Sequence, residues 1–208
     1  MAKPNLKEQI YNAILNDIDE GVYPPGTILN EKTLLEKYHC SKSPVREALI
    51  ALCADKVLKN LPRFGYEVTY LTENDIYQML EFRLALESGI LARKLDSIGE
   101  QEIRQLTELN GQCLRKDLSP REHWEANSLF HKTLIGFCGN SYVTEQLAAT
   151  LKRLTRAYAQ TRWNKQIPFV NLPHDCKHHK NILEALTKKN VAQLKKALEA
   201  DLQDFKIV

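Results

Sequence analysis

Apolar residues recur every three to four positions along most of this chain, which is the period of an α-helix. Only 8 glycines and 8 prolines interrupt its 208 residues. The sequence therefore predicts a mostly α fold, and it argues against a β-sandwich or a βαβ fold. With 43% hydrophobic and 26% charged residues, the chain can bury a real core, and its length allows one large domain or two small ones.

Several classes of protein are excluded by what the sequence does not contain. No run of about 18 apolar residues is present, so we expect no membrane span. The five cysteines are odd in number and form no C-x-x-C pair, which argues against a disulfide framework and a cysteine zinc ribbon. The N-terminus lacks the apolar centre of a signal peptide, so we expect a cytoplasmic protein.

The first 70 residues predict three short helices. The first ends at residues 21–26, which include two prolines and two glycines. The second begins after Asn30, a good N-cap, and the third begins with Ser43 as cap and Pro44 in the first helical position. Apolar residues at helical spacing are Leu6, Ile10, Ile14 and Ile18 in the first helix, and Val45, Ala48, Leu49 and Leu52 in the third.

A small hairpin follows the third helix. Residues 57–61 and 66–70 are typical of short strands, and residues 62–65 between them contain a proline and a glycine. Three helices followed by a two-stranded wing predict a winged helix-turn-helix domain over residues 1–70.

Charge within this domain is concentrated rather than strong. The whole chain carries a formal charge of only +3, and residues 1–70 sum to zero. The segment from Lys32 to Arg63, however, contains seven basic residues and only three acidic ones. The third helix directs Lys42, Ser43 and Arg46 away from its apolar side, which is the arrangement that a nucleic-acid backbone attracts.

Residues 71–208 predict a second domain made only of helices. A complete capping box at Ser119 to Glu122 begins one of them, and Asn190 caps the last. Six helices of this length predict an antiparallel all-helical bundle. We expect them from residue 72 on, near 99–116, 120–138, 142–162, 174–188 and 191–206, with an interhelical loop at 163–173.

The segment SKSPVREAL, from Ser41 to Leu49, together with PGTILNE before it, resembles the GntR family of bacterial transcription factors. The resemblance implies that the third helix reads the major groove and that the wing approaches the minor groove. Arginine pairs bidentately with guanine, and lysines and hydroxyls contact phosphates. The implied DNA-binding residues are Lys32, Ser41, Lys42, Ser43, Arg46, Arg63 and Gly65.

Three positions depart from the usual family pattern. Lys42 stands where arginine is usual, which keeps the charge but loses the bidentate fork. Ser43 replaces a threonine, a mild change. His39 stands where glycine often forms the turn between the second and third helices, so we expect either a strained left-handed residue there or a turn of different shape.

The second domain resembles the FCD-type effector domain of the FadR subfamily. The similar segments are EFRLALE at 81–87, NSLFH at 127–131, GN at 139–140 and HKNILEAL at 179–186. In metal-binding relatives an aspartate and three histidines hold a divalent ion. The resemblance assigns those positions here to Asn127, His131, His179 and Asp201.

This ligand set leaves two interpretations open. Two imidazoles, a carboxylate and an amide oxygen suit Zn²⁺, Ni²⁺ or Mn²⁺, although the amide is a weak, neutral ligand. The alternative is a metal-free polar cluster in which Asp201 pairs with a histidine. For Arg83, likewise, a clamp for an effector carboxylate stands against a buried pair with Glu87. We expect His123, His174 and His178 to be surface or loop residues.

Together these features predict a bacterial transcriptional regulator that binds a double-stranded, pseudo-palindromic DNA operator as a homodimer. The resemblance implies a small organic acid as effector and, commonly, repression that the effector relieves. The competing hypothesis is a metal-dependent enzyme built on Asn127, His131, His179 and Asp201, but no nucleophile or general base accompanies them. A protein-binding adaptor is a third hypothesis, and salt-dependent DNA binding distinguishes it from the first.

Overall fold

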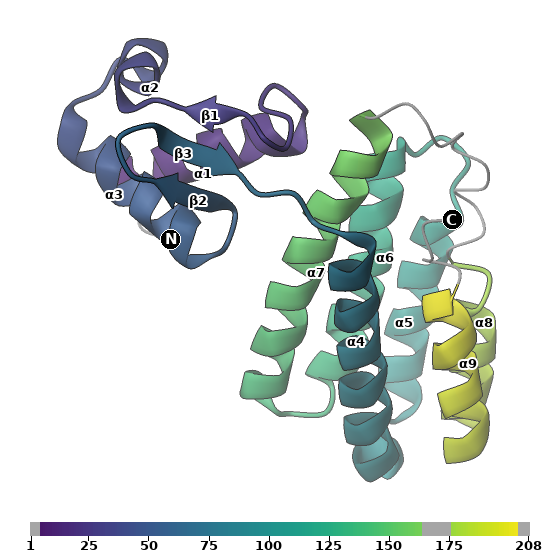
Figure 1. Ribbon diagram of the computed structural model, residues 1–208. Helices are drawn as coiled ribbons and strands as arrows, with labels where there is room; N and C mark the ends of the chain where they lie inside the picture. Colours follow the sequence, from purple (N-terminus) through teal and green to yellow (C-terminus); the bar gives the residue numbers. More distant parts are fainter. Residues whose placement is uncertain (1–4, 164–175, 204–208) are drawn as a thin grey trace. The chain divides into compact units, whose positions relative to one another are not determined.

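The computed structural model describes residues 5–163 and 176–203 of the chain (Figure 1). The predicted loop at 163–173 falls almost entirely outside these residues, as do His174 and the predicted end of the last helix. The elements are α1 (Leu6–Asp19), β1 (Ile28–Leu29), α2 (Glu31–Tyr38), α3 (Lys42–Ala54), β2 (Leu58–Leu61), β3 (Gly65–Val68), α4 (Glu73–Lys94), the 3-10 helix η1 (Leu95–Ser97), α5 (Glu100–Cys113), α6 (Pro120–Gly136), α7 (Ser141–Trp163), α8 (His179–Thr187) and α9 (Val191–Gln203).

The chain divides into two compact units. The first ends at Thr72, close to the expected boundary at residue 70, and also takes in α7 from Arg156 on. The second holds α4, α5, α6, the first part of α7, and the helices after it. Among the described residues, no helix combines the length and the apolarity that a membrane span needs.

The first unit is a winged helix-turn-helix, as the sequence predicts. Asn5 begins α1 with a capping box, in which its Oδ1 accepts from the Glu8 amide at 2.9 Å. The core combines one face of each helix with the inner side of the sheet: Ile10, Ile14, Ile18, Leu29, Leu34, Val45, Ala48, Leu49, Leu52, Val57, Leu58, Tyr66 and Val68.

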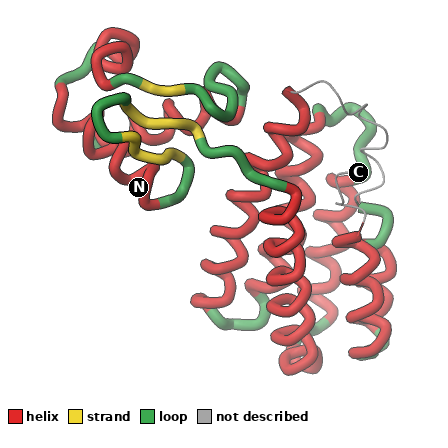
Figure 2. Tube along the Cα trace, viewed as in Figure 1, coloured by secondary structure: helices red, strands yellow, loops and turns green. Residues whose placement is uncertain are grey.

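The wing differs from the prediction by one strand. β3 pairs with β2 in the expected hairpin, but it also pairs with β1, so the sheet has the order β1-β3-β2 and is antiparallel throughout. Figure 2 shows these strands in yellow. β1 contains only two residues, which is too short for an alternation of apolar and polar side chains to be recognised.

The beginning of α3 also differs from the prediction. Its N-cap is Ser41, not Ser43, and the helix starts at Lys42. Pro44 therefore lies in the third helical position rather than the first. Proline is tolerated there because the amides of the first turn have no helical partner in any case.

The second unit is the predicted all-helical bundle (Figure 1). Contacts join α4 to α6 and α9, α5 to α6 and α8, and α8 to α9. The predicted caps are confirmed: Ser119 and Glu122 form a reciprocal capping box on α6, and Asn190 accepts from the amide of Gln193 at 3.0 Å. Several charged side chains are buried among apolar ones in this bundle, including Arg83, Glu87, His131 and Asp201.

Candidate functional site

One side of α3 is buried in the core and the other is exposed. The exposed side carries Lys42, Ser43, Arg46 and Ile50, as expected, and we call these four residues the reading face. The Ser41 hydroxyl at the N-cap makes no capping hydrogen bond, while the Ser43 hydroxyl donates to Glu47 Oε1 at 3.0 Å. The helix therefore presents cations and hydroxyls at its N-terminal end, where the helix dipole also favours an anion.

Glu31 orients the basic side chains of the reading face. Its Oε1 accepts from Arg46 Nε at 3.1 Å, and its Oε2 lies 3.9 Å from Lys42 Nζ. The Tyr66 hydroxyl donates to the same carboxylate at 3.5 Å. Glu31 was not among the predicted site residues, although it belongs to the PGTILNE segment. A surface ion pair of this kind is weak, so Arg46 remains available to another anionic partner.

Two of the remaining predicted residues, Arg63 and Gly65, lie in the wing and have a left-handed backbone. Arg63 has φ 72° in the turn between β2 and β3, and Gly65 has φ 128°. A Cβ at Gly65 would meet the Leu29 carbonyl oxygen at 2.4 Å, so only glycine lets β1 approach β3. Phe64 between them is 72% exposed at the wing tip. Lys32 is exposed in the first turn of α2.

Of the two shapes expected for the turn before α3, the structure has the left-handed one. His39, the C-cap of α2, has φ 49° and ψ 47°. This conformation places Cβ near the following carbonyl, and glycine avoids the resulting strain.

The second part of the site is a chain of buried charged groups in the bundle. Arg83 Nε donates to Glu87 Oε1 at 2.8 Å, and Glu87 Oε2 lies 2.7 Å from His131 Nδ1. On its other side, His131 Nε2 lies 3.0 Å from Asp201 Oδ2, and His179 Nε2 lies 3.7 Å from Asp201 Oδ1. Three of the four predicted metal-site residues thus meet, and we call His131, His179 and Asp201 the histidine–aspartate cluster.

Within this row of buried charged groups, each side chain changes the pKa of its neighbours. Burial raises the pKa of Glu87, but the neighbouring Arg83 and His131 charges outweigh it and hold the value at about 2. Burial lowers the pKa of His131, yet Glu87 above all, with Asp201, raises it to about 9. In the absence of another cation, His131 is therefore an imidazolium ion between two carboxylates.

Unsatisfied atoms gather on the inner side of the cluster. His131 Nε2, His179 Nε2 and Asp201 Oδ1 are buried and have no aligned hydrogen bond in the part of the chain that the structure describes. One ligand atom from each residue lies within 4.8 Å of the others. Buried polar atoms without partners are costly, and atoms that converge in this way fit a common cation.

The outer nitrogens of both histidines are held by hydrogen-bond partners. Glu87 contacts His131 Nδ1, and Asn110 Oδ1 lies 3.2 Å from His179 Nδ1. Phe130 stacks on His179 with the ring centroids 3.8 Å apart. A carboxylate or amide on the far nitrogen is the usual support for a histidine that ligates a metal. Asn110 was not among the predicted site residues, because it belongs to no motif.

Asn127 is the fourth predicted residue, and its amide has a different partner. It is buried on α6, and its Nδ2 donates to Cys176 Sγ at 3.8 Å. His123, expected at the surface, is buried on the same helix, so that expectation was wrong; its Nε2 lies 3.7 Å from Cys176 Sγ. The hydrogen bond with Cys176 lowers the pKa of the Cys113 thiol to about 5, helped by His179.

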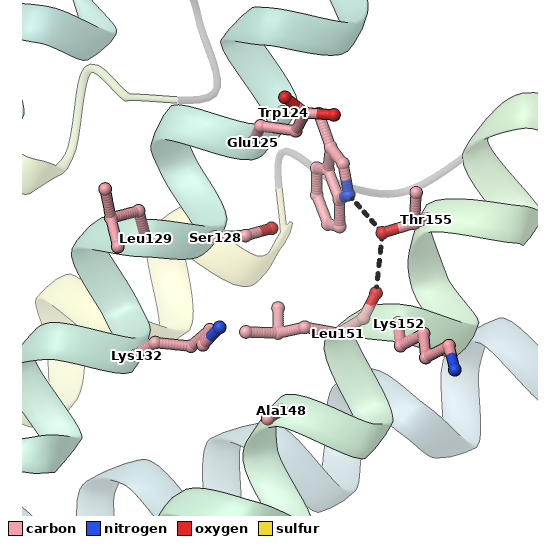
Figure 3. A pocket seen from close by; sticks show the side chains of 9 residues that line it. All are labelled: Trp124, Glu125, Ser128, Leu129, Lys132, Ala148, Leu151, Lys152 and Thr155. Carbon is pink, nitrogen blue, oxygen red and sulfur yellow. Dashed lines mark hydrogen bonds between the residues drawn. The ribbon is translucent and has the colours of Figure 1, made fainter. Parts of the chain in front are cut away.

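A separate pocket of about 580 Å³ lies between α6 and α7 (Figure 3). Trp124 Nε1 donates to Thr155 Oγ1 there at 2.7 Å. Lys132 and Lys152 are the cations in its lining, and none of the predicted site residues belongs to it. The remaining lining residues are Glu125, Ser128, Leu129, Ala148 and Leu151.

Comparison with known proteins gives a family match for each of the two domains. Residues 6–68 match the bacterial regulatory proteins of the gntR family, and residues 78–204 match the FCD domain. Together with the fold, these matches define a DNA-binding transcriptional regulator with an effector-binding C-terminal domain. The chain belongs to the GntR family, as an FCD-type member.

Individual relatives are also regulators. The chain is similar to the HTH-type transcriptional regulator YdhC of Bacillus subtilis, with 27% identity over 206 residues, 85% of this chain and 92% of YdhC. The gluconate operon transcriptional repressor of the same species is 32% identical over 129 residues, 61% of this chain and 52% of the repressor. A GntR regulator from Rhodococcus sp. RHA1 shares the fold, with TM-score 0.71 and 18% identity over 96% of this chain and 95% of that one. These comparisons give the alternative of a metal-dependent enzyme no support.

Proposed function

We propose that this regulator represses transcription as a homodimer on a pseudo-palindromic operator, in the bacterial cytoplasm, and that a small carboxylate effector releases it. One relative, the gluconate operon regulator, is itself a repressor. Two copies are needed because one reading face matches one half-site, and a two-fold operator mirrors a two-fold dimer.

The observation that carries DNA recognition is the exposed, oriented Arg46. Its side chain is 57% exposed and is held by Glu31 on the side of α3 that faces away from the core. We assign Arg46 to a guanine edge in the major groove, and Lys32 and Lys42 to phosphates. The Ser41 and Ser43 hydroxyls contact the DNA backbone next to these phosphates. Arg63 and Gly65 bring the wing to the minor groove.

Operator binding measured against salt concentration tests this assignment. An operator selected from a random DNA library should bind with an affinity that falls steeply with salt, because each lysine or arginine on a phosphate releases counterions. Light scattering on the full chain should give the mass of two chains. An affinity that does not change with salt would favour the adaptor hypothesis instead.

In the bundle, the histidine–aspartate cluster would hold one divalent cation, Zn²⁺, Ni²⁺ or Mn²⁺. The converging, unsatisfied Nε2 and Oδ1 atoms support this reading. Three protein ligands leave coordination positions for water or for an effector carboxylate. Asn127 is peripheral, and Asn127→Asp should raise the affinity for the cation by adding a negative charge.

Arg83 has two roles in this proposal. Its Nε pairs with Glu87 and so supports His131, while its Nη2 is buried and has no hydrogen-bond partner among the described residues. That second nitrogen is the atom we assign to the effector carboxylate, because a hydrogen bond between a guanidinium and a carboxylate is charge-assisted and strong. In a reporter assay, we expect an organic acid to relieve repression by the parent. In the presence of the same acid, Arg83→Lys should still repress.

Elemental analysis of protein incubated with nickel or manganese and then exchanged into metal-free buffer tests the cation. We expect one ion per chain in the parent and loss of the ion in His131→Ala. No retained ion in the parent would leave the metal-free polar cluster as the correct interpretation.

A further inference from the structure

A second group of ligand-type side chains lies beside the histidine–aspartate cluster. Cys113 is the last residue of α5, Cys176 precedes α8, and His179 is the first residue of α8. All three are buried, and one ligand atom from each lies within 4.8 Å of the others. We propose that Cys113, Cys176 and His179 bind a thiophilic cation, Zn²⁺ or Cd²⁺, and that His123 supplies the fourth ligand. We call these four residues the thiol cluster.

The spacing of the thiol cluster suits a tetrahedral ion. Zinc lies about 2.0–2.3 Å from nitrogen and sulfur ligands, which places neighbouring ligands of a tetrahedron roughly 3.3–3.8 Å apart. The limit of 4.8 Å between the ligand atoms of Cys113, Cys176 and His179 exceeds this by about 1 Å. Small rotations of the side chains therefore suffice to close the three ligands on an ion.

His123 is held next to both cysteines. Its Nε2 lies 3.7 Å from Cys176 Sγ, and its ring also bonds to the main chain of Cys113. The amide of Asn127 donates to the same sulfur at 3.8 Å. The Asn127 donor stabilises the thiolate form of this sulfur, which is the form that ligates a metal, while the bond to the Cys113 main chain leaves the lone pair of His123 on Nε2.

The ligands come from three separate elements. Cys113 belongs to α5, His123 to α6, and the other two to α8 and the turn before it. An ion held by these residues cross-links these parts of the bundle and stabilises the folded state, since the unfolded chain offers no such site.

His179 belongs to both groups of ligands, and this separates them by chemistry. A neutral imidazole has one lone pair, so His179 ligates one ion at a time. Thiolates prefer soft cations, whereas carboxylate and imidazole accept harder ones such as Mn²⁺. The thiol cluster therefore takes cadmium or zinc, and an ion there excludes one from the histidine–aspartate cluster.

Cadmium titration of the metal-free full chain tests the thiol cluster. The buffer contains a phosphine reductant, which keeps the thiols reduced, and the ultraviolet charge-transfer absorption of cadmium thiolate is followed. We expect this absorption to rise to one equivalent of Cd²⁺ and then stop. Cys113→Ser and Cys176→Ser should each lower the apparent affinity at least about tenfold. Cys138→Ser, which changes another buried cysteine of the same unit, should bind like the parent.

Cadmium NMR of the parent chain gives an answer that needs no variant to fold. A resonance in the range of mixed thiolate and imidazole ligands is expected. A resonance in the range of oxygen and nitrogen ligands alone would overturn the proposal, as would unchanged thiolate absorption in both cysteine variants whose circular dichroism matches the parent. Loss of absorption in Cys138→Ser equal to that in Cys113→Ser would overturn it too.

Discussion

The reading face of α3 and the histidine–aspartate cluster both depend on a glutamate that holds a cation, but in opposite surroundings. Glu31 contacts Arg46, whose side chain is 57% exposed, so water screens their attraction. Glu87 contacts Arg83 and His131, and all three side chains are almost completely buried. Exposed charges are available to a partner and add little stability. Buried charges must be fully paired, and His179 Nε2 and Asp201 Oδ1 are the exception, since neither has an aligned hydrogen bond among the described residues.

The largest difference should appear when each glutamate loses its charge. Glu87→Gln leaves the buried Arg83 without its counter-ion and His131 with Asp201 alone, and we expect a loss of at least about 3 kcal/mol in the free energy of unfolding. Glu31→Gln, the matched change at the surface, should cost less than about 1 kcal/mol. Chemical denaturation of the full chain in a chelator, followed by circular dichroism, measures both. Equal losses in the two variants would remove the contrast.

The buried charged groups of the bundle should also make the stability of the metal-free protein depend on pH. The pKa of His131 is raised from 6.5 to about 9 by folding, so its contribution to stability is complete below pH 6.5 and is lost as pH rises through 9. The pKa of Glu87 is lowered from 4.5 to about 2, so its contribution is complete above pH 4.5 and is lost as pH falls through 2. Melting temperatures across this range should fall at the alkaline end in the parent but not in His131→Gln. Parallel profiles would contradict the assignment.

On the reading face, the expected effect is on binding rather than on folding. Arg46→Ala should weaken operator binding by about 1–3 kcal/mol and relax the preference at one base pair in each half-site. Its free energy of unfolding should change by less than about 0.5 kcal/mol. Arg104→Ala is the control, because Arg104 is also exposed and paired with a glutamate, Glu100, but lies on α5. Fluorescence anisotropy at fixed salt makes the comparison, and equal affinities for parent and Arg46→Ala would show that α3 is wrongly assigned.

The smallest expected effect lies in the turn before α3. His39→Gly removes a side chain from a left-handed backbone, and we expect the free energy of unfolding to rise by at most about 1 kcal/mol. The gain is limited because glycine also increases the freedom of the unfolded chain. A less stable variant would mean that the His39 side chain contributes contacts that outweigh the strain.

The sequence predicted the reading face of α3 more completely than the buried charged groups of the bundle, for a physical reason. The sides of α3 follow from its helical period, so Lys42, Arg46 and the apolar residues opposite them could be assigned directly. The two-residue β1 was missed because it is too short to show a period. The position of the α3 cap was also missed, because Ser41 and Ser43 are both good caps.

In the bundle, the family resemblance identified His131, His179 and Asp201, which the structure brings together. It did not identify their neighbours. Asn110 lies on a different helix from His179, and Cys113 is far from Cys176 in sequence, so only the packing of the helices joins them. Side chains that meet across a bundle leave no spacing pattern in the sequence, unlike those on one helix face.

Manganese binding tests the contrast between the two regions most directly. Isothermal titration of the metal-free full chain with Mn²⁺, a cation that prefers carboxylate and imidazole to thiolate, should give one site per chain. Arg46→Ala should bind Mn²⁺ like the parent, whereas His131→Ala should lose the site. A parent chain that binds no Mn²⁺, or a His131→Ala variant that binds it equally well, would contradict the view that the buried charges of the bundle form a cation site.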